Sequence, residues 1–454
     1  MFAMGIAVVT IANDFSAINV ALPTMESDFD TNINTIQWVV NAYALTFGVM
    51  IVTGGRLADM FGRRNAFFLG TAIFASMSAL GGAAQSETWL IATRTLMGIG
   101  GALMWPAILG MTYALLPEDK AGLAGGIVIG AAGLGNAIGP LIGGVLTDAL
   151  SWRWIFFLNV PISAFAVLVT HRLVRVTEPD PGEQRIDYAG IAALSVGLVS
   201  LLVALDQVDD WGFGDPRVIG LLALSVALLL AFVPIERRAG TSALVPRAVM
   251  ANETFRASCL AILLMSATFF AALLYLPQFM QHQLAYSPLE AGVGMLPFLA
   301  TFACVSFVAG PLYERLGAKI LASVGALCIT IAPFAFSLVG NRSHYTSLIV
   351  GMVVLGIGIG SFYPTATTAG VTSVDESQTS LAGGIVYMFQ IAGGSIGLGL
   401  TTMVFSAQGS FVEGIEAAFR LDAGLSLVGF LIALFFVGGH LVSRRNKPDS
   451  TPSA

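Results

Sequence analysis

The stretch Gly54-Gly55-Arg56-Leu57-Ala58-Asp59-Met60-Phe61-Gly62-Arg63-Arg64 is a short, charged segment between two long apolar segments. It carries three arginines, and short loops rich in Arg and Lys stay on the cytoplasmic side of a membrane. A weaker copy follows far downstream, Gly310-Pro311-Leu312-Tyr313-Glu314-Arg315-Leu316-Gly317-Ala318-Lys319. The two copies predict a membrane chain that repeats itself.

The composition of the 454 residues is that of an all-α integral membrane protein. Hydrophobic residues make up 56% of the chain and charged residues 11%, with a mean hydropathy of +0.82, whereas ordinary soluble domains are about 45–50% apolar. The apolar runs are mostly about 20 residues long, which suits membrane-spanning helices and not the alternating strands of a barrel. A net charge of −6 argues against a nucleic-acid partner, which would need a basic face.

The cysteines do not indicate a metal or redox site, and the first segment does not indicate a signal peptide. The three cysteines lie in apolar runs without metal-binding or redox spacing, so we expect small core residues, no metal site and no cofactor other than a proton gradient. The segment Met1 to Met25 lacks a basic start and contains Asp14, so it is read as the first span and not as a signal peptide.

Apolar windows between charged or Gly/Pro breaks predict 14 spans. They are 4–24, 35–55, 66–84, 88–112, 122–147, 154–174, 187–206, 217–235, 257–279, 289–310, 318–339, 345–368, 380–405 and 422–443. With both termini cytoplasmic, Arg94 lies within a span and only four basic residues face outward, as expected if basic loops stay inside; these are Arg153, Arg217, Arg342 and Arg420.

Two polar seams divide the chain. The loop from His171 to Asp187 and the segment from Arg237 to Thr254 separate a first six-span bundle, a central pair of spans and a second six-span bundle. The glycine-bracketed motif follows the second span of each bundle, which predicts parallel repeats about an axis along the membrane normal. The expected domains are residues 1–174, 175–255 and 256–445, followed by a cytoplasmic tail at 446–454.

The loop motif carries a family resemblance. Gly55, Asp59, Gly62, Arg63 and Arg64 resemble the loop signature between spans two and three of the major facilitator superfamily, specifically its 14-span drug:proton antiporter branch of the multidrug efflux type. Glycines allow a tight turn, and Asp59, expected near the start of the third helix, would suit the positive end of its dipole. The resemblance implies a gating role, shared by the copy at Gly310, Glu314, Arg315 and Gly317; the alternative is a charged turn that only sets topology.

The fifth span resembles the branch's antiporter signature, which implies export in exchange for protons. Its glycines recur at spacing four, as in helices that approach closely, and Pro140 removes a backbone donor where a helix could pivot. The motif residues are Gly135, Gly139, Pro140, Gly143 and Gly144. Tight packing without a mechanistic role is the alternative.

Asp14 and Arg94 are the candidate proton-coupling pair. Asp14 stands where the branch has a membrane-embedded carboxylate, and such charges are costly unless they face a partner or a cavity. Arg94, in the fourth span, falls at a similar depth. We expect Arg94 to pair with ionised Asp14 and protonation to release the pair; a permanent structural ion pair is the alternative. Asp14 is the only acid expected clearly inside the membrane, which favours a neutral or monovalent lipophilic substrate and few coupled protons.

Other polar residues within spans could line a substrate cavity or simply bond between helices. The candidates are Asn19, Asn41, Tyr43, Trp105, Tyr275, Gln278, Tyr363, Tyr387 and Gln390. The segment Trp152 to Pro161 also resembles the branch, and it is read as structural because Trp suits a membrane interface.

Together these features predict a multi-pass plasma-membrane transporter that is not an enzyme and functions as a monomer. Its expected partners are a small-molecule substrate, protons and the lipid bilayer. The first interpretation is a proton-coupled exporter of hydrophobic or monocationic compounds working by alternating access. The alternatives are a dedicated exporter of a metabolite, antibiotic or lipid, a proton-coupled importer, and a non-transporting receptor or scaffold, which has no need of a buried titratable pair.

Overall fold

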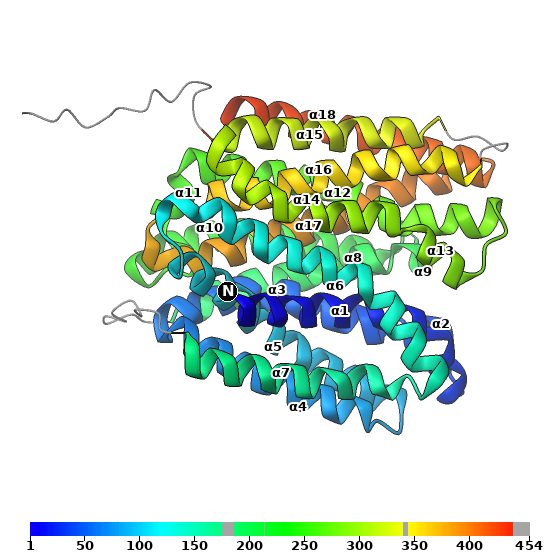
Figure 1. Ribbon diagram of the computed structural model, residues 1–454, viewed down its shortest axis with the longest axis horizontal. Helices are drawn as coiled ribbons and strands as arrows, with labels where there is room; N and C mark the ends of the chain where they lie inside the picture. The colour runs from blue at the N-terminus through cyan, green and yellow to red at the C-terminus, as the bar shows by residue number, and fades with distance from the viewer. Residues whose placement is uncertain (175–185, 213, 339–343, 439–454) are drawn as a thin grey trace, which may run out of the picture.

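The computed structural model describes residues 1–174, 186–212, 214–338 and 344–438. Within these ranges the chain is helical and contains no strand. Fourteen helices in the described part of the chain are long and apolar enough to cross a membrane, which confirms the expected number of spans. Figure 1 shows them running side by side across the view, with the first bundle below and the last helices above.

The long helices form two sets of six with a pair between them. The first set is α1 (Phe2–Asp28), α3 (Trp38–Phe61), α4 (Arg63–Gly82), α5 (Glu87–Ala114), α6 (Ala121–Ala149) and α7 (Arg153–Leu173). The pair is α8 (Tyr188–Asp206) and α10 (Pro216–Ala239). The second set is α12 (Glu253–Gln283), α14 (Leu296–Leu316), α15 (Ala318–Phe336), α16 (Tyr345–Val371), α17 (Thr379–Ser406) and α18 (Phe411–Phe436).

Short helices lie in the connections. They are α2 (Ile33–Ile36), η1 (Glu118–Lys120), α9 (Val208–Trp211), η2 (Gly240–Ser242), α11 (Arg247–Ala251), α13 (Pro288–Gly294) and η3 (Glu376–Gln378). The domain boundary expected at residue 255 falls in the first turn of α12, and the tail expected at 446–454 lies outside the described residues.

Several predicted span boundaries are wrong by about two turns or more, among them ends where charged residues extend a helix instead of ending it; the span predicted at 289–310 is α14 from Leu296 to Leu316. The span predicted at 35–55 continues as α3 to Phe61, and the span predicted at 422–443 begins as α18 at Phe411. Glu413, Glu416 and Arg420 occupy the first turns of α18, and Arg420 pairs with Glu416 at 2.9 Å. Asp422 therefore lies in the middle of a span.

The two bundles meet through equivalent close contacts. The hexapeptide Leu-Ala-Gly-Gly-Ile-Val occurs at 123–128 near the start of α6 and again at 381–386 near the start of α17. A Cβ on Gly55 of α3 would lie 2.6 Å from the carbonyl oxygen of Ser380, and one on Gly310 of α14 would lie 2.9 Å from that of Gly122. Each bundle thus packs its second helix on the fifth helix of the other.

The antiporter-like glycines of α6 also serve contacts within the first bundle. A Cβ on Gly135 would lie 2.7 Å from the carbonyl oxygen of Val9 in α1, and one on Gly139 or Gly143 would overlap Ser16 or Ala17. Gly144 is buried, and α6 continues through Pro140. Small residues at this spacing let the two backbones approach closely.

Gly143→Ala is expected to destabilise the protein. Alanine favours helices by about 1 kcal/mol over glycine, but its Cβ would overlap the Ala17 carbonyl oxygen and push α1 away, and overpacking of this kind costs about 1–3 kcal/mol. The apparent Tm in detergent should fall. Gly5→Ala, in α1 with no atom within 4 Å of the added Cβ, is the matched control; equal Tm values for the two variants would contradict the packing argument.

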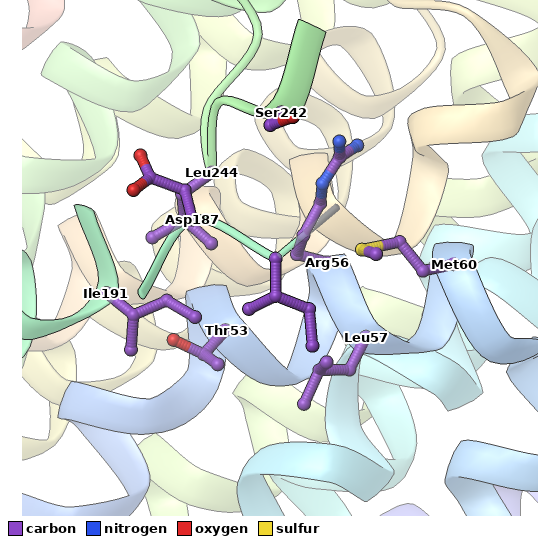
Figure 2. A pocket seen from close by; sticks show the side chains of 9 residues that line it. Thr53, Arg56, Leu57, Met60, Asp187, Ile191, Ser242 and Leu244 are labelled. Carbon is purple, nitrogen blue, oxygen red and sulfur yellow. The ribbon is translucent and has the colours of Figure 1, made fainter. Parts of the chain in front are cut away.

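The central pair docks on the motif end of α3. Arg56 of α3 is almost fully buried and faces a cavity of about 10 Å³ that Asp187, Ser242 and Leu244 also line (Figure 2). Glu236, near the end of α10, accepts hydrogen bonds from the backbone N–H groups of Leu244 and Val245 at 3.1 and 2.9 Å. The start of α8 and the segment that follows α10 thus lie against the motif helix beside the buried Arg56.

Candidate functional site

Asp14 and Arg94 form an ion pair inside the first bundle. The Arg94 Nη1 donates to Asp14 Oδ2 at 2.5 Å, and both side chains are fully buried. Arg94 Nε also donates to the Val39 carbonyl oxygen at 2.8 Å, and the guanidinium lies over the Tyr43 ring, 4.2 Å from its centroid. The pair expected from the sequence is formed, and it joins α1 to α3 and α5.

Two neutral side chains complete the hydrogen bonding of Asp14. Asn159 of α7 donates to Asp14 Oδ1 at 2.7 Å and also to the Ser78 hydroxyl of α4 at 3.1 Å. Ser78 in turn donates to the Phe156 carbonyl oxygen at 2.8 Å. Asn159 belongs to the segment read as structural, and neither residue was predicted, because neutral polar side chains in spans resemble ordinary packing.

Protonation of Asp14 would destabilise this hydrogen-bonded network. Removing one partner of a buried ion pair typically costs about 3–5 kcal/mol because the other charge is left uncompensated. Protonation of Asp14 would likewise leave Arg94 as a buried cation in contact with a neutral acid. Such an arrangement can convert the binding of a proton into a rearrangement of α1 against α5 and α7.

The loop motif forms a second buried cluster, here named the α3–α17 latch: Asp59, Arg63, and the backbone of Glu376, Ser380 and Leu381. Asp59 Oδ2 accepts from the Leu381 N–H at 2.7 Å, and its Oδ1 accepts from the Ser380 N–H at 3.3 Å. Arg63 Nε donates to Asp59 Oδ1 at 3.1 Å. A carboxylate at the N-terminus of α17 is stabilised by the free N–H groups and the helix dipole there.

Arg63 ties further chain segments to the latch. It donates to the carbonyl oxygens of Gly110 in α5, at 3.3 Å, and of Glu376. Asp375, beside Glu376, accepts hydrogen bonds from the Ser377 hydroxyl and N–H, which lower the pKa of Asp375. The latch therefore holds the first bundle to the second at the motif end.

Asp59 lies at the positive end of the dipole of a different helix from the one predicted. It lies in the last turn of α3, and the helix whose N-terminus it caps is α17 of the other bundle, because α3 is longer than the sequence suggested. Gly62 makes the turn into α4 with φ +98°, a conformation that other residues rarely adopt. Arg64 donates to the His171 carbonyl oxygen of α7 at 2.8 Å.

The downstream copy keeps the turn but has a different charge arrangement. Gly317 has φ +82°, like Gly62, and Gly310 packs on α6. Glu314 and Arg315 are exposed, and Ala318 stands after the turn where the first motif has Arg63. The two interfaces are equivalent in backbone packing, and the buried Asp–Arg pair lies on one of them.

Aromatic rings lead from Arg94 to the interface between the bundles. Tyr43 stacks on Phe47 at 5.8 Å between ring centroids, and Phe47 contacts Tyr387 of α17 at 5.5 Å. Trp105 of α5 lies 4.5 Å from Tyr387. The Tyr43 hydroxyl and Trp105 Nε1 are buried without a hydrogen-bond partner among the described residues. Three predicted cavity residues, Tyr43, Trp105 and Tyr387, therefore come together.

The other cavity candidates lie elsewhere. Asn41 donates to Asp206 of α8 at 2.8 Å, and exposed Asn19 donates to the Phe15 carbonyl oxygen. Tyr275 shares a hydrogen bond with Thr402, and Tyr363 shares one with Ser266, both within the second bundle. Gln278 and Gln390 are half-buried.

The expectation that Asp14 is the only acid inside the membrane is wrong. Asp422 is fully buried in the middle of α18. The sequence placed it at the start of the last span because three charged residues precede it.

Two six-helix bundles with a buried ion pair and a charged latch define a multi-span membrane transporter. The profile of the Major Facilitator Superfamily matches residues 4–252 and 258–454. The chain therefore belongs to this superfamily, and its 14 spans confirm the resemblance to the 14-span branch.

Relatives and a solved structure agree with this assignment. The chain is 32% identical to the puromycin resistance protein pur8 of Streptomyces alboniger, over 97% of this chain and 90% of that protein. It is 33% identical to the cephamycin export protein CmcT of Amycolatopsis lactamdurans, over 93% and 87%, and 30% identical to the multidrug transporter protein MdtP of Bacillus subtilis, over 87% and 73%. The fold matches that of the human organic anion transporter MFSD10 with a TM-score of 0.69 and 16% identity, over 95% and 98% of the two chains.

Proposed function

We propose that this transporter is a proton-coupled antiporter that exports lipophilic neutral or monocationic compounds, antibiotics among them, across the plasma membrane. The observation that carries the proposal is the fully buried Asp14–Arg94 pair, since it places a titratable acid and its counter-ion inside one bundle. The names of the relatives, which concern resistance and export, support the direction of transport. The distribution of Lys and Arg supports an orientation with both termini in the cytoplasm.

Protonation of Asp14 is the driving event in this mechanism. With Asp14 ionised, as in the ion pair, the latch closes the motif end, which is the cytoplasmic end in the proposed orientation. A proton taken from outside neutralises Asp14, releases Arg94 and favours the conformation open to the cytoplasm. Substrate binding there is coupled to release of the proton.

Transport into inside-out proteoliposomes tests the proposal. Puromycin is the probe, and an acidic lumen supplies the proton gradient. Accumulation should require the gradient and should collapse on addition of a protonophore. Accumulation that a protonophore leaves unchanged would rule out proton coupling. A panel that adds a cephamycin and lipophilic dyes separates broad export from a dedicated exporter, which would move one compound only.

Tyr387→Ala is expected to weaken export of aromatic cations more than that of non-aromatic compounds. The Tyr387 ring contacts both Phe47 and Trp105 at the interface between the bundles, and a ring stacked against a cation contributes about 0.5–2 kcal/mol. The KM for puromycin should rise several-fold at unchanged protein abundance. Tyr387→Phe keeps the ring and should retain most activity. Tyr275→Ala, whose ring lies between Phe405 and Phe419, tests whether loss of any aromatic ring has the same effect.

A further inference from the structure

Asp422 is a buried acid that the Asp14–Arg94 mechanism does not use. Its side chain is fully buried in α18, and both carboxyl oxygens lack a hydrogen-bond partner among the described residues. The neighbouring Ser426 hydroxyl donates to the Asp422 backbone carbonyl and leaves the carboxyl group without a donor.

The internal repeat shows which position Asp422 occupies. Phe156, Asn159 and Ser163 in α7 have the same spacing as Phe419, Asp422 and Ser426 in α18. Their surroundings correspond too: a Cβ on Gly81 of α4 would lie 3.2 Å from the Phe156 ring, and the Phe336 ring of α15 lies 5.1 Å from that of Phe419. Asp422 is thus the counterpart of Asn159, the side chain that donates to Asp14.

The second bundle has no counterpart of Arg94. A Cβ on Gly98 of α5 would meet Tyr43, Thr46 and Phe47, and one on Gly356 of α16 would meet their counterparts Phe298, Thr301 and Phe302. This correspondence places Met352, which is fully buried, at the position of Arg94.

Thr268 occupies the position of Asp14 in the second bundle. The Leu22-Pro23 and Leu276-Pro277 pairs align α1 with α12 in this register. Thr268 is fully buried, and its hydroxyl has no partner among the described residues. The second bundle therefore has polar side chains at the equivalent positions, but its acid, Asp422, lies on the sixth helix and not on the first. The position equivalent to Arg94 carries no cation.

The groups around Asp422 do not compensate a charge. The helices packed on α18 are α12, α15 and α17. Their titratable and charged side chains are Glu253, Arg256, Cys259, Tyr275, His282, Lys319, Cys328 and Tyr387. On α18 itself, Arg420 is exposed and paired with Glu416. Among the described residues, none of these groups interacts with the Asp422 carboxyl. An isolated ionised carboxylate in such surroundings is far costlier than a neutral carboxylic acid.

We infer that Asp422 is a second proton-binding site, located in the C-terminal bundle, and that its proton is exchanged during the transport cycle. It holds the proton in the conformation seen here, in which the α3–α17 latch is closed and Asp14 is ionised. In this closed-latch conformation Asp422 is therefore protonated and Asp14 is not. The inference that Asp422 binds a proton depends only on its burial and on the missing cation. The inference that this proton is exchanged rests on the proposed proton-coupled export.

Infrared spectra of wild type and of the Asp422 variants, compared by difference, test whether Asp422 binds a proton. At neutral pH, wild type should show the C=O stretching band of a buried carboxylic acid, and Asp422→Asn should lack it. Asn is the residue that the first bundle has at the equivalent position, so the change preserves shape. Asp422→Glu, the second variant, should restore a band at a shifted frequency. If the wild-type band is absent, or if Asp422→Asn retains it, the proposed proton site is wrong.

A reversal measurement in proteoliposomes tests the exchange. With the membrane potential clamped, the pH gradient at which net puromycin flux vanishes gives the number of protons per substrate. This number should fall by one in Asp422→Asn and stay at the wild-type value in Asp422→Glu. An unchanged number in Asp422→Asn would overturn the exchange. If no pH gradient drives flux in wild type, the antiporter proposal and the exchange both fail, and the infrared band alone decides the proton site.

Discussion

Asp14→Asn is expected to stop net export while leaving exchange of substrate for substrate intact. The amide keeps the shape of Asp14 but cannot ionise, so Arg94 permanently lacks its carboxylate partner and position 14 no longer takes up and releases a proton in each cycle. In proteoliposomes each coupled proton supports about tenfold accumulation per pH unit, because one unit corresponds to 1.36 kcal/mol. That accumulation should disappear in the variant, whereas labelled puromycin should still exchange with unlabelled puromycin.

Asp28→Asn is the matched control for this prediction. Asp28 lies at the end of the same helix and pairs with Arg153 at 2.7 Å, but both side chains are partly exposed. Exposed ion pairs contribute only about 0–1 kcal/mol, so accumulation should stay near the wild-type value. Wild-type accumulation by Asp14→Asn would refute the coupling role of Asp14, and loss of exchange as well would indicate a folding defect.

The Asp14–Arg94 pair was predictable because charged residues within apolar spans are rare and conspicuous. Depth along two helices then sufficed to bring the two charges together. Asn159 and Ser78 were not predictable in the same way, since a neutral polar residue in a span is compatible with simple packing. Their role depends on α4 and α7 lying against α1, which only the three-dimensional arrangement shows.

The number of spans could be read from the sequence, but their ends could not. Hydropathy windows stop at charged residues, although a helix continues past them where the side chains reach solvent or pair with one another. This moved the boundary of the last span beyond its true start and placed Asp422 at the edge of the membrane. The partner of Asp59 was missed for another reason: the start of α17 is more than 300 residues away in the chain.

Asp59→Asn is expected to open the motif end of the molecule. The substitution removes the charge that faces the N-terminus of α17 and replaces one acceptor oxygen by an amide nitrogen. Hydrogen bonds to charged groups contribute about 1.5–3 kcal/mol, which corresponds to a shift of about 10- to 100-fold in the ratio of closed to open conformations. Net export should fall because the closed state is no longer reached efficiently.

Cysteine labelling measures this opening directly. Ala382 is fully buried beside Leu381, so Ala382→Cys, in a background without the three native cysteines, should react slowly with a water-soluble maleimide. Adding Asp59→Asn should raise the labelling rate about tenfold or more, in line with the shift in the conformational ratio. Glu314→Gln changes the equivalent acid of the downstream copy, which is exposed, and should leave the rate unchanged.

Equal acceleration by both substitutions would mean that loss of any acid at this end loosens the interface, whereas no acceleration by Asp59→Asn would show that the latch does not hold the bundles together. Acceleration by Asp59→Asn alone would assign the closed state to the contact between Asp59 and the start of α17, since among the described residues the buried Asp–Arg pair lies on this interface and not on the one between α14 and α6.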